Sequence, residues 1–407
     1  MSVSRPPLDS DVTIAGGGMV GSALACALAQ GGLRVALVEG HVPPELDRDA
    51  PADLRVSALS PASRRMFERI GAWQAMVERR VTPYEAMEVW DAGGAGLIHF
   101  DSAELGEPTL GHIIENRVVQ LALLERAKAL PDVRLYTPCR VAGFDNADDH
   151  SVVRLDDGSA HRTAVLVAAD GRDSQLRQWA GIGTRGWEYD QHAVVTTVAC
   201  EHGHGNTAWQ RFLPGGPLAF LPLWDGRCSI VWSTSPEHAR ELLDLPDETF
   251  RIELARAFDH RLGAVLEVGK RAAFPLRYMH ADRYVAGRTV LVGDAAHGVH
   301  PLAGQGVNLG LLDVASLAEV MLHARARGAD IGDPRVLARY ARSRRGHNMA
   351  MGLAFDGFKR LFGSQQVPMR IARNIGMGMA GRFAPARQRF MRAAMGLDGD
   401  LPPLARP

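Results

Sequence analysis

Short apolar runs along this chain repeatedly end at a glycine-rich turn, and apolar residues at helical spacing follow the turn. This unit occurs at residues 11–30, 164–177 and 289–315. Short apolar runs without polar alternation are typical of parallel strands that helices cover on both faces. Ligands of such sheets bind outside the carboxyl ends of the strands. The pattern therefore predicts an α/β fold with its site at these turns.

The first turn reads GGGMVG over residues 16–21 and fits the spacing G-x-G-x-x-G. We expect Gly16 to make the tight turn, Gly18 to admit a pyrophosphate and Gly21 to let helix and strand pack. The next apolar run, 34–38, ends in Glu39, at the place where an acid accepts ribose hydroxyls. Because strand, turn, helix and acid occur together, the stretch predicts a dinucleotide site.

Two later units also place an acid at the end of an apolar run. One ends in Asp170-Gly171, where Ser174 is expected to cap a helix. The other ends in Asp294, and its helical pattern starts at Val307. A helix N-terminus offers unpaired N–H groups and about half a positive charge, so it stabilises an electron-rich or anionic ring. The three strand-end acids together predict one composite site.

Between these units the pattern changes to strand-like alternation. Residues 84–100 predict a hairpin around a Gly-Gly turn, and residues 194–232 predict strands throughout, with a turn at 210–216. We interpret both as one mixed sheet that forms a pocket wall, and we expect residues 273–276 to return the chain to the first domain. The aromatic residues of this region are expected mainly in the core: Trp209, Phe212, Phe220, Trp224 and Trp232.

Composition limits the class of protein. With 407 residues, 46% of them hydrophobic, the chain predicts more than one module with a sizeable core. A formal net charge of zero gives no whole-molecule attraction to nucleic acid. Four cysteines far apart, and histidines without further ligands at metal spacing, predict neither a disulfide framework nor a metal site. No apolar run approaches the roughly 18 residues of a spanning helix. Together with the cysteine pattern, this favours a cytoplasmic protein.

The region from Arg335 onward is predicted to be helical and is strongly basic, with fourteen Lys or Arg residues against three acids. Apolar residues are interleaved with these charges. Two interpretations stay open: an amphipathic surface for the inner face of a membrane or for an acidic partner, and a solvated face over a buried apolar stripe.

Three motifs in order resemble the group A flavoprotein aromatic hydroxylases, the class typified by para-hydroxybenzoate hydroxylase. They are GGGMVG at 16–21, DGRDSQLR at 170–177, and GDAAH with PLAGQGVNLG at 293–310. The last is similar to the signature of the ubiquinone-biosynthesis hydroxylases, as are LGHIIENR at 110–117 and GGPLAFLPL at 215–223. Within that subfamily, VWDAGGAGLIHFD at 89–101, LGHIIEN at 110–116 and the stretch around residues 261–263 look closest to the 2-polyprenylphenol hydroxylase acting at ring position C5. Many relatives carry Arg-Asp where this chain has Leu312-Asp313, which leaves the C6 enzyme as an alternative to the C5 enzyme. Hydroxylation at C1 in the same pathway is a further alternative.

The resemblance implies a Rossmann-like FAD-binding domain with an inserted mixed-sheet substrate domain and C-terminal helices. The FAD-binding domain would comprise residues 1–80, 111–182 and 276–334, the substrate domain residues 81–110 and 183–275, and the basic helical region residues 335–407.

The resemblance also assigns roles to residues. It raises Arg55, which from the pattern alone is equally a surface residue, to an FAD contact. The ring environment of the flavin would comprise Pro301, Gly304 and Gln305, and no catalytic base is indicated. The cofactor-binding set implied is Gly16, Gly18, Met19, Val20, Gly21, Glu39, Arg55, Arg117, Gln120, Asp170, Gly171, Gly293, Asp294, Pro301, Gly304, Gly306, Val307 and Asn308.

The chemistry implied is monooxygenation. NAD(P)H would reduce FAD, and O₂ would form a C4a-hydroperoxide of the flavin that hydroxylates the phenol ring of a polyprenylated ubiquinone precursor. The partners expected are the lipid substrate, O₂, and a membrane surface or a biosynthetic complex, but no nucleic acid. The alternative outside enzymes is a flavin-fold protein that binds or escorts a prenyl lipid without catalysis.

Overall fold

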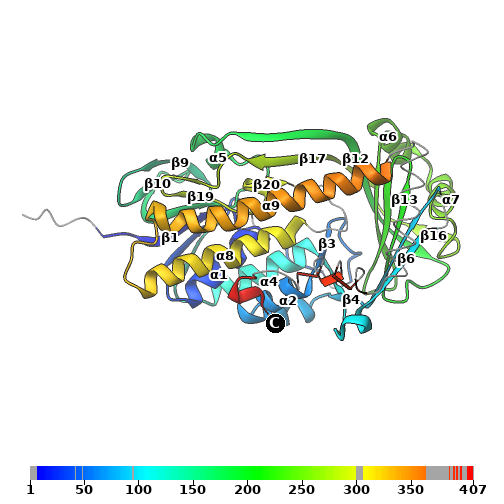
Figure 1. The fold of residues 1–407 in the computed structure, drawn as a ribbon, viewed down its shortest axis with the longest axis horizontal. Coiled ribbons are helices and arrows are strands. Elements are labelled where there is room, and N and C mark those ends of the chain that lie inside the picture. The colour runs from blue at the N-terminus through cyan, green and yellow to red at the C-terminus, as the bar shows by residue number, and fades with distance from the viewer. Residues whose placement is uncertain are drawn as a thin grey trace, which may run out of the picture.

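The protein is described by a computed structural model that covers residues 7–41, 43–47, 49–93, 96–298, 306–363, 385, 388–389, 391–392, 395–396 and 401–406. The molecule is elongated, with one sheet and its helices at one end and a second sheet at the other (Figure 1). Two long strands run along one side from the first end to the second, and helix α9 lies beneath them.

The first sheet has eight strands among the described residues, in the order β18-β19-β11-β1-β2-β8, with β10 and β9 continuing from β11. Strands β1, β2, β8, β11 and β19 pair in parallel, so their carboxyl ends lie at one edge. The bounds are β1 (Ser10–Ala15), β2 (Val35–Val38), β8 (Val133–Tyr136), β9 (Val141–Asn146), β10 (Ser151–Leu155), β11 (Ala160–Ala168), β18 (Val285–Ala286) and β19 (Thr289–Leu291). The predicted α/β architecture is confirmed.

Helices cover this sheet and share its core. Helix α1 packs between α4 and α8, and α9 packs on α8. Their bounds are α1 (Met19–Gln30), α4 (Asn116–Lys128), α8 (Gly306–Ala326) and α9 (Pro334–Gly363). Within the described part of the chain, α8 is long and apolar enough to span a membrane by itself. Most of it is buried, however, so its composition is explained by packing inside the protein.

The second sheet has nine strands among the described residues, in the order β20-β17-β12-β15-β14-β13-β5-β6, with β16 beside β12. One face packs in a core with α6 (Pro236–Asp244) and α7 (Asp247–Ala257), and the other face points toward the first domain. The bounds are β5 (Ala86–Asp91), β6 (Leu97–Asp101), β12 (Thr184–Cys200), β13 (Thr207–Leu213), β14 (Gly216–Pro222), β15 (Cys228–Thr234), β16 (Val265–Val268), β17 (Ala272–Ala281) and β20 (His297–Gly298).

A three-stranded sheet, in the order β3-β7-β4, was not predicted as a separate unit. Its bounds are β3 (Val56–Leu59), β4 (Thr82–Tyr84) and β7 (Gly111–Glu115). The short helices are α2 (Pro61–Arg69), α3 (Trp73–Val77) and α5 (Gln175–Trp179), and the 3₁₀ turns are η1 (Ser102–Leu105), η2 (Gly293–Ala295) and η4 (Pro403–Ala405). Its strands occur where the chain passes from a segment of the first sheet to a segment of the second sheet, or back.

Three sequence predictions concern the strands and turns of the second sheet. The hairpin at 84–100 is confirmed, since β5 and β6 pair in antiparallel fashion. The turn predicted at 210–216 is wrong in extent, because β13 continues to Leu213 and pairs with β14. Residues 273–276 lie in the first half of β17, which pairs with β12 as far as Ala281 and runs back toward the first sheet (Figure 1). The division into six segments remains a prediction.

Candidate functional site

The glycine turn after β1 requires glycine at two positions for different reasons. Gly16 has φ of +107°, and a Cβ there would stand 2.2 Å from the carbonyl oxygen of Ala169. A Cβ on Gly21 would stand 1.9 Å from the carbonyl oxygen of Gly16, so the first turn of α1 packs directly on the loop. A Cβ on Gly18 would meet no atom within 4 Å. The turn is therefore tight at its ends and open in its middle.

Two side chains hold this turn from its outer side. The backbone N–H of Gly17 donates to Glu39 Oε2 at 2.5 Å, and the N–H of His41 donates to Glu39 Oε1 at 2.7 Å. Gln120 Nε2 donates to the Gly17 carbonyl at 3.0 Å. The predicted acid at the end of β2 thus lies against the glycine loop, beside Gln120 from helix α4.

The second strand-end acid has one oxygen occupied and one free. Asp170 Oδ2 accepts from the N–H of Leu176, whereas Oδ1 is buried without a hydrogen-bond partner among the described residues. Arg117 Nε is buried without a partner in the same sense. Ser174 accepts from the N–H of Arg177 and caps α5, as predicted. Both atoms belong to predicted cofactor residues, and polar groups of a bound cofactor would satisfy them.

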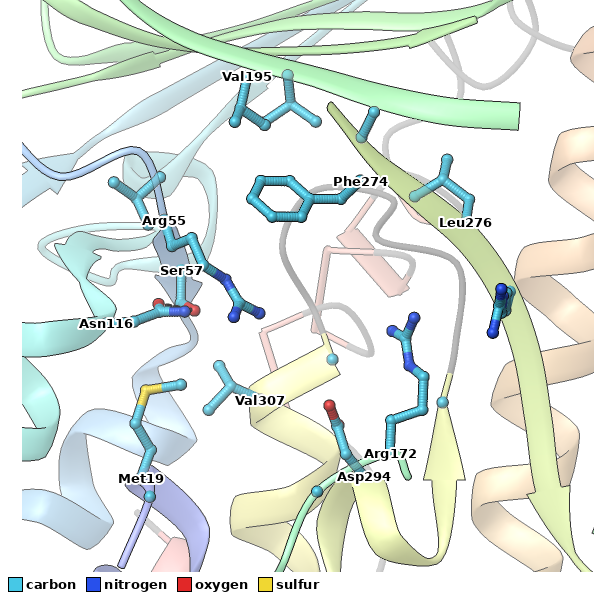
Figure 2. A pocket seen from close by; sticks show the side chains of 18 of the residues that line it. Met19, Arg55, Ser57, Asn116, Arg172, Val195, Phe274, Leu276, Asp294 and Val307 are labelled. Atoms are coloured by element: carbon cyan, nitrogen blue, oxygen red, sulfur yellow. Dashed lines mark hydrogen bonds between the residues drawn. The ribbon is translucent and has the colours of Figure 1, made fainter. Parts of the chain in front are cut away.

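A cavity of about 620 Å³ lies between the two large sheets. Figure 2 shows Met19, Val307 and Asp294 on the side of the first domain, and Val195, Phe274 and Leu276 on the side of the second sheet. The N-terminal end of α8 faces this space through Gly306 and Val307. One cavity therefore joins the carboxyl edge of the first sheet to one face of the second.

The predicted cofactor residues divide into three groups. Those that line the cavity are Gly18, Met19, Val20, Arg55, Gly171, Asp294, Gly306 and Val307. Those that lie outside its lining are Gly16, Gly21, Glu39, Arg117, Gln120, Asp170, Gly293 and Asn308. Pro301, Gly304 and Gln305 lie outside the described residues.

Asn308 is turned away from the cavity. Its Nδ2 donates to the carbonyl of Ala58 at 2.8 Å, and its Oδ1 accepts from the N–H of Ser60 and from Ser63 Oγ. The side chain, 5% exposed, thereby ties the first turn of α8 to the junction of β3 and α2. In this structure, the Asn308 side chain fixes the position of the helix N-terminus.

Arg55 comes from the loop before β3, and its guanidinium lies 5.8 Å from the ring centre of Phe274 on β17. This contact joins a residue of the first domain to one of the second sheet across the cavity (Figure 2). Sequence reasoning left Arg55 as a surface residue or as an FAD contact, and the structure places it in the lining of the cavity.

Several polar cavity residues were missed by sequence reasoning. Ser57 Oγ donates to Asn116 Oδ1 at 2.7 Å, and Arg172 lines the cavity (Figure 2). Arg172 directly follows the Asp170-Gly171 motif, and that adjacency was a usable signal. Gln210, inside a predicted turn, carried no signal.

A buried cluster of charges lies beside the cavity. Asp313 of α8 accepts from His297 Nε2 at 2.5 Å, from Arg344 Nε at 2.8 Å and from Asn348 Nδ2 at 2.9 Å. It also accepts from the N–H of Gly293 at 3.1 Å. Burial alone would raise the pKa of Asp313, but the charges and hydrogen bonds of His297 and Arg344 outweigh it and hold this pKa well below its ordinary value. The hydrogen bond to Asp313 gives His297 a structural role.

No group of three or more His, Cys, Asp or Glu residues among those described could hold a metal ion. Among the described residues that line the cavity, the charged ones are the arginines Arg55, Arg172 and Arg277 and the acids Asp173 and Asp294. Arg277 pairs with Glu188 at 3.0 Å.

An FAD molecule fits these residues. The open space at Gly18 suits a pyrophosphate, the orphan oxygen of Asp170 suits a hydroxyl, and the start of α8 suits an electron-rich ring. A parallel sheet with this glycine turn and a second sheet closing the cavity defines a two-domain FAD-binding fold.

Comparison with known proteins identifies the family. The family model described as "FAD binding domain" matches residues 9–352, so the chain belongs to that family. The 3-demethoxyubiquinol 3-hydroxylase of Escherichia coli (strain K12) is 40% identical, over 95% of this chain and 99% of the relative. Ubiquinone hydroxylase UbiL of Rhodospirillum rubrum is 42% identical over 95% of this chain and 90% of the relative. The human mitochondrial ubiquinone biosynthesis monooxygenase COQ6 is 37% identical over 94% of this chain and 92% of the relative.

Solved structures agree with the fold. Para-nitrophenol 4-monooxygenase PnpA from Pseudomonas putida DLL-E4 superimposes with a TM-score of 0.77 at 22% identity, covering 95% of this chain and 98% of that chain. The probable FAD-dependent monooxygenase pqsL from Pseudomonas aeruginosa gives a TM-score of 0.74 at 26% identity, covering 90% and 99%. The chain is an FAD-dependent aromatic monooxygenase with the para-hydroxybenzoate hydroxylase type of fold, and NAD(P)H is the typical reductant of such enzymes. This places it among enzymes rather than among lipid escorts.

Proposed function

We propose that this enzyme hydroxylates the aromatic ring of a polyprenylated ubiquinone precursor. The observation that carries the proposal is the single cavity shared by the cofactor residues of the first domain and an apolar face of the second sheet. A ring held against that face would lie beside the cofactor. The names of relatives that are 37–42% identical over nearly the whole chain support the substrate class.

We assign the cofactor residues as follows. The glycine loop at Gly18 would receive the FAD pyrophosphate, Glu39 the adenosine ribose, and Asp170 and Asp294 the hydroxyl-rich chain between pyrophosphate and ring. Val307, at the start of α8, would lie at the flavin ring. Bound FAD would supply the redox chemistry, accepting electrons from NAD(P)H and activating O₂ for transfer of one oxygen atom to the substrate. Pro301, Gly304 and Gln305 belong to the same proposal as neighbours of the ring.

The residues of the chain would then bind and orient the substrate ring and exclude water from it. The second-sheet wall is formed mainly by apolar side chains, which replace water around the ring and around the first part of a prenyl tail. The helix dipole at Gly306 and Val307 favours negative charge on the ring that binds there. Arg55 and Phe274 lie at the boundary between the two regions, where they would separate cofactor from substrate.

Two ring positions compete. The motifs quoted above favour C5 of a 2-polyprenylphenol, whereas the E. coli relative is named for position 3 of a demethoxyubiquinol. We favour the second, because that similarity extends over 99% of the relative's length and not over a few motifs. Hydroxylation at C6 or at C1 of the ring is the alternative within the same pathway.

We further propose that the basic region after residue 335 brings the enzyme to the cytoplasmic face of a membrane, where a polyprenyl lipid resides. Protein with FAD bound and with residues 364–407 removed would then bind anionic vesicles less than the full chain does. Equal binding by both would contradict this proposal.

The test of function uses the full chain reconstituted with FAD, supplied with NADH or NADPH and ¹⁸O₂. The substrates are a short-chain 2-polyprenylphenol and a short-chain 3-demethoxyubiquinol. We expect one ¹⁸O atom in the ring of the demethoxyubiquinol for each nicotinamide oxidised, with the position determined by NMR. Nicotinamide oxidation that yields peroxide alone with both substrates would contradict the proposed function.

A further inference from the structure

On strands β12 to β15, the cavity face of the second sheet carries two polar side chains in an otherwise apolar surface. Side chains alternate between the two faces of each strand. On β12, β14 and β15, the cavity face presents Ala, Val, Leu and Pro side chains together with Ser233. On β13 it presents Gln210. The opposite face of β13 carries Trp209, which packs with the core under α6 and α7.

Gln210 is the larger of these two polar residues and is 6% exposed. Its backbone pairs with Ala219 on β14 and with Val89 on β5, so neighbouring side chains on both sides are apolar. Among the described residues, its side-chain amide makes no hydrogen bond, and its polar atoms are open to the cavity. The small Ala219 leaves the amide open toward the cavity.

An amide that opens into an apolar cavity loses its contacts with water when a substrate fills the space, so a substrate group that hydrogen-bonds to it is favoured over one that does not. Both ends of the amide are polar: Nε2 donates, and Oε1 accepts. A single hydroxyl group can pair with both ends of the amide, because a hydroxyl both donates and accepts a hydrogen bond. An ether or a methoxy oxygen only accepts.

We propose that Gln210 binds a ring hydroxyl of the aromatic substrate and thereby selects a phenol or quinol over its methyl ether. This inference rests on the proposed function, because it names the group of that substrate which the wall recognises. The phenol O–H would donate to Oε1, and Nε2–H would donate to the phenol oxygen. The amide takes no proton from the ring, so Gln210 is a positioning residue and its loss weakens binding and orientation.

The experiment measures binding separately from turnover. The full chain with FAD bound is titrated with 2-farnesylphenol and with its O-methyl ether, followed by the change in flavin fluorescence. We expect wild type to bind the phenol at least ten-fold more tightly than the ether. Gln210→Met, which keeps the length and removes the hydrogen bonds, should bind both ligands within about two-fold of each other, with FAD content unchanged. Gln210→Ala is a second variant with the same expected loss of preference.

Ser229→Ala is the matched control. Ser229 lies on β15 in the same sheet, its hydroxyl is buried without a partner among the described residues, and it does not line the cavity. It should keep the wild-type preference. Equal binding of phenol and ether by wild type would overturn the inference, as would a folded Gln210→Met that keeps the preference. A wild type that binds the phenol selectively but hydroxylates neither substrate contradicts only the proposed function.

Discussion

The carboxylate of Asp313 lies 2.5 Å from the imidazole of His297, and both side chains are almost completely buried. Asp313 belongs to α8, and His297 belongs to β20, immediately after the turn that carries Asp294. The same carboxylate accepts from Arg344 of α9. One buried acid therefore joins α8 and the turn, which both line the cavity, to helix α9 behind them.

Asp313→Asn should destabilise the protein strongly. The amide keeps the shape but removes the negative charge, which leaves Arg344 buried without its counter-ion. Breaking a buried ion pair in this way costs about 3–5 kcal/mol. Urea unfolding of the protein with FAD bound, followed by circular dichroism, measures the loss. Glu68→Gln, which breaks the exposed pair with Arg64 on α2, should cost less than about 1 kcal/mol. Similar losses in both variants would contradict this account of Asp313.

Two glycine substitutions should separate cofactor binding from folding. Gly18→Ala adds a methyl group that meets no protein atom, so the fold should persist while the methyl group occupies space for the pyrophosphate. We expect FAD affinity to fall at least ten-fold, about 1.4 kcal/mol, with little change in the melting temperature of the apoprotein.

Gly21→Ala should behave in the opposite way, because its Cβ would stand 1.9 Å from the carbonyl oxygen of Gly16. We expect a lower melting temperature of the apoprotein, measured by circular dichroism, and poor recovery of soluble protein. A Gly18→Ala variant that binds FAD like wild type would show that the pyrophosphate lies elsewhere.

Arg55→Met should affect cofactor binding without affecting stability. The side chain is exposed, and its described contact is with the Phe274 ring. Surface changes of this kind alter unfolding by about 0.5 kcal/mol or less. Loss of a charged contact to FAD, in contrast, should weaken binding by about ten-fold. Fluorescence titration with FAD and thermal unfolding of the apoprotein give the two values. A normal FAD affinity would return Arg55 to its second interpretation, that of a surface residue.

Stability should fall in acid because of His112. Burial, with a smaller effect of Arg64, lowers the pKa of this histidine to about 4. In the unfolded chain, a histidine titrates near 6.5. The folded state therefore favours the neutral ring, and its contribution to stability is complete above pH 6.5 and is lost as pH falls toward 4. The shift corresponds to about 3 kcal/mol.

His112→Leu tests this contribution. The variant keeps an apolar contact with Trp73, whose ring lies 5.0 Å from the imidazole, and it has no proton to bind. Between pH 7 and pH 4 its free energy of unfolding should decline by about 3 kcal/mol less than that of wild type. Parallel pH profiles for the two proteins would contradict the assignment.

Much of the first domain could be predicted, because its signals are local. A glycine spacing, an acid at the end of a strand and a helix cap each depend on neighbours within a few residues, and Gly16, Gly21 and Ser174 have the predicted local roles. The separate sheet β3-β7-β4 was missed because its three short strands come from distant segments. The extent of β17 was missed because its pairing with β12 is a tertiary property.

The sequence by itself determined the class of protein: an FAD-binding α/β fold with a second sheet, indicated by motifs in which each residue serves its own turn, strand or helix. Only the tertiary structure decided what these motifs surround. It turned Asn308 toward Ser60 and away from the cavity, and it brought Gln210 to the wall opposite the cofactor residues. The reason is physical. Local geometry depends on adjacent residues, whereas a cavity is formed by side chains from strands and helices whose relative positions depend on the packing of the whole core.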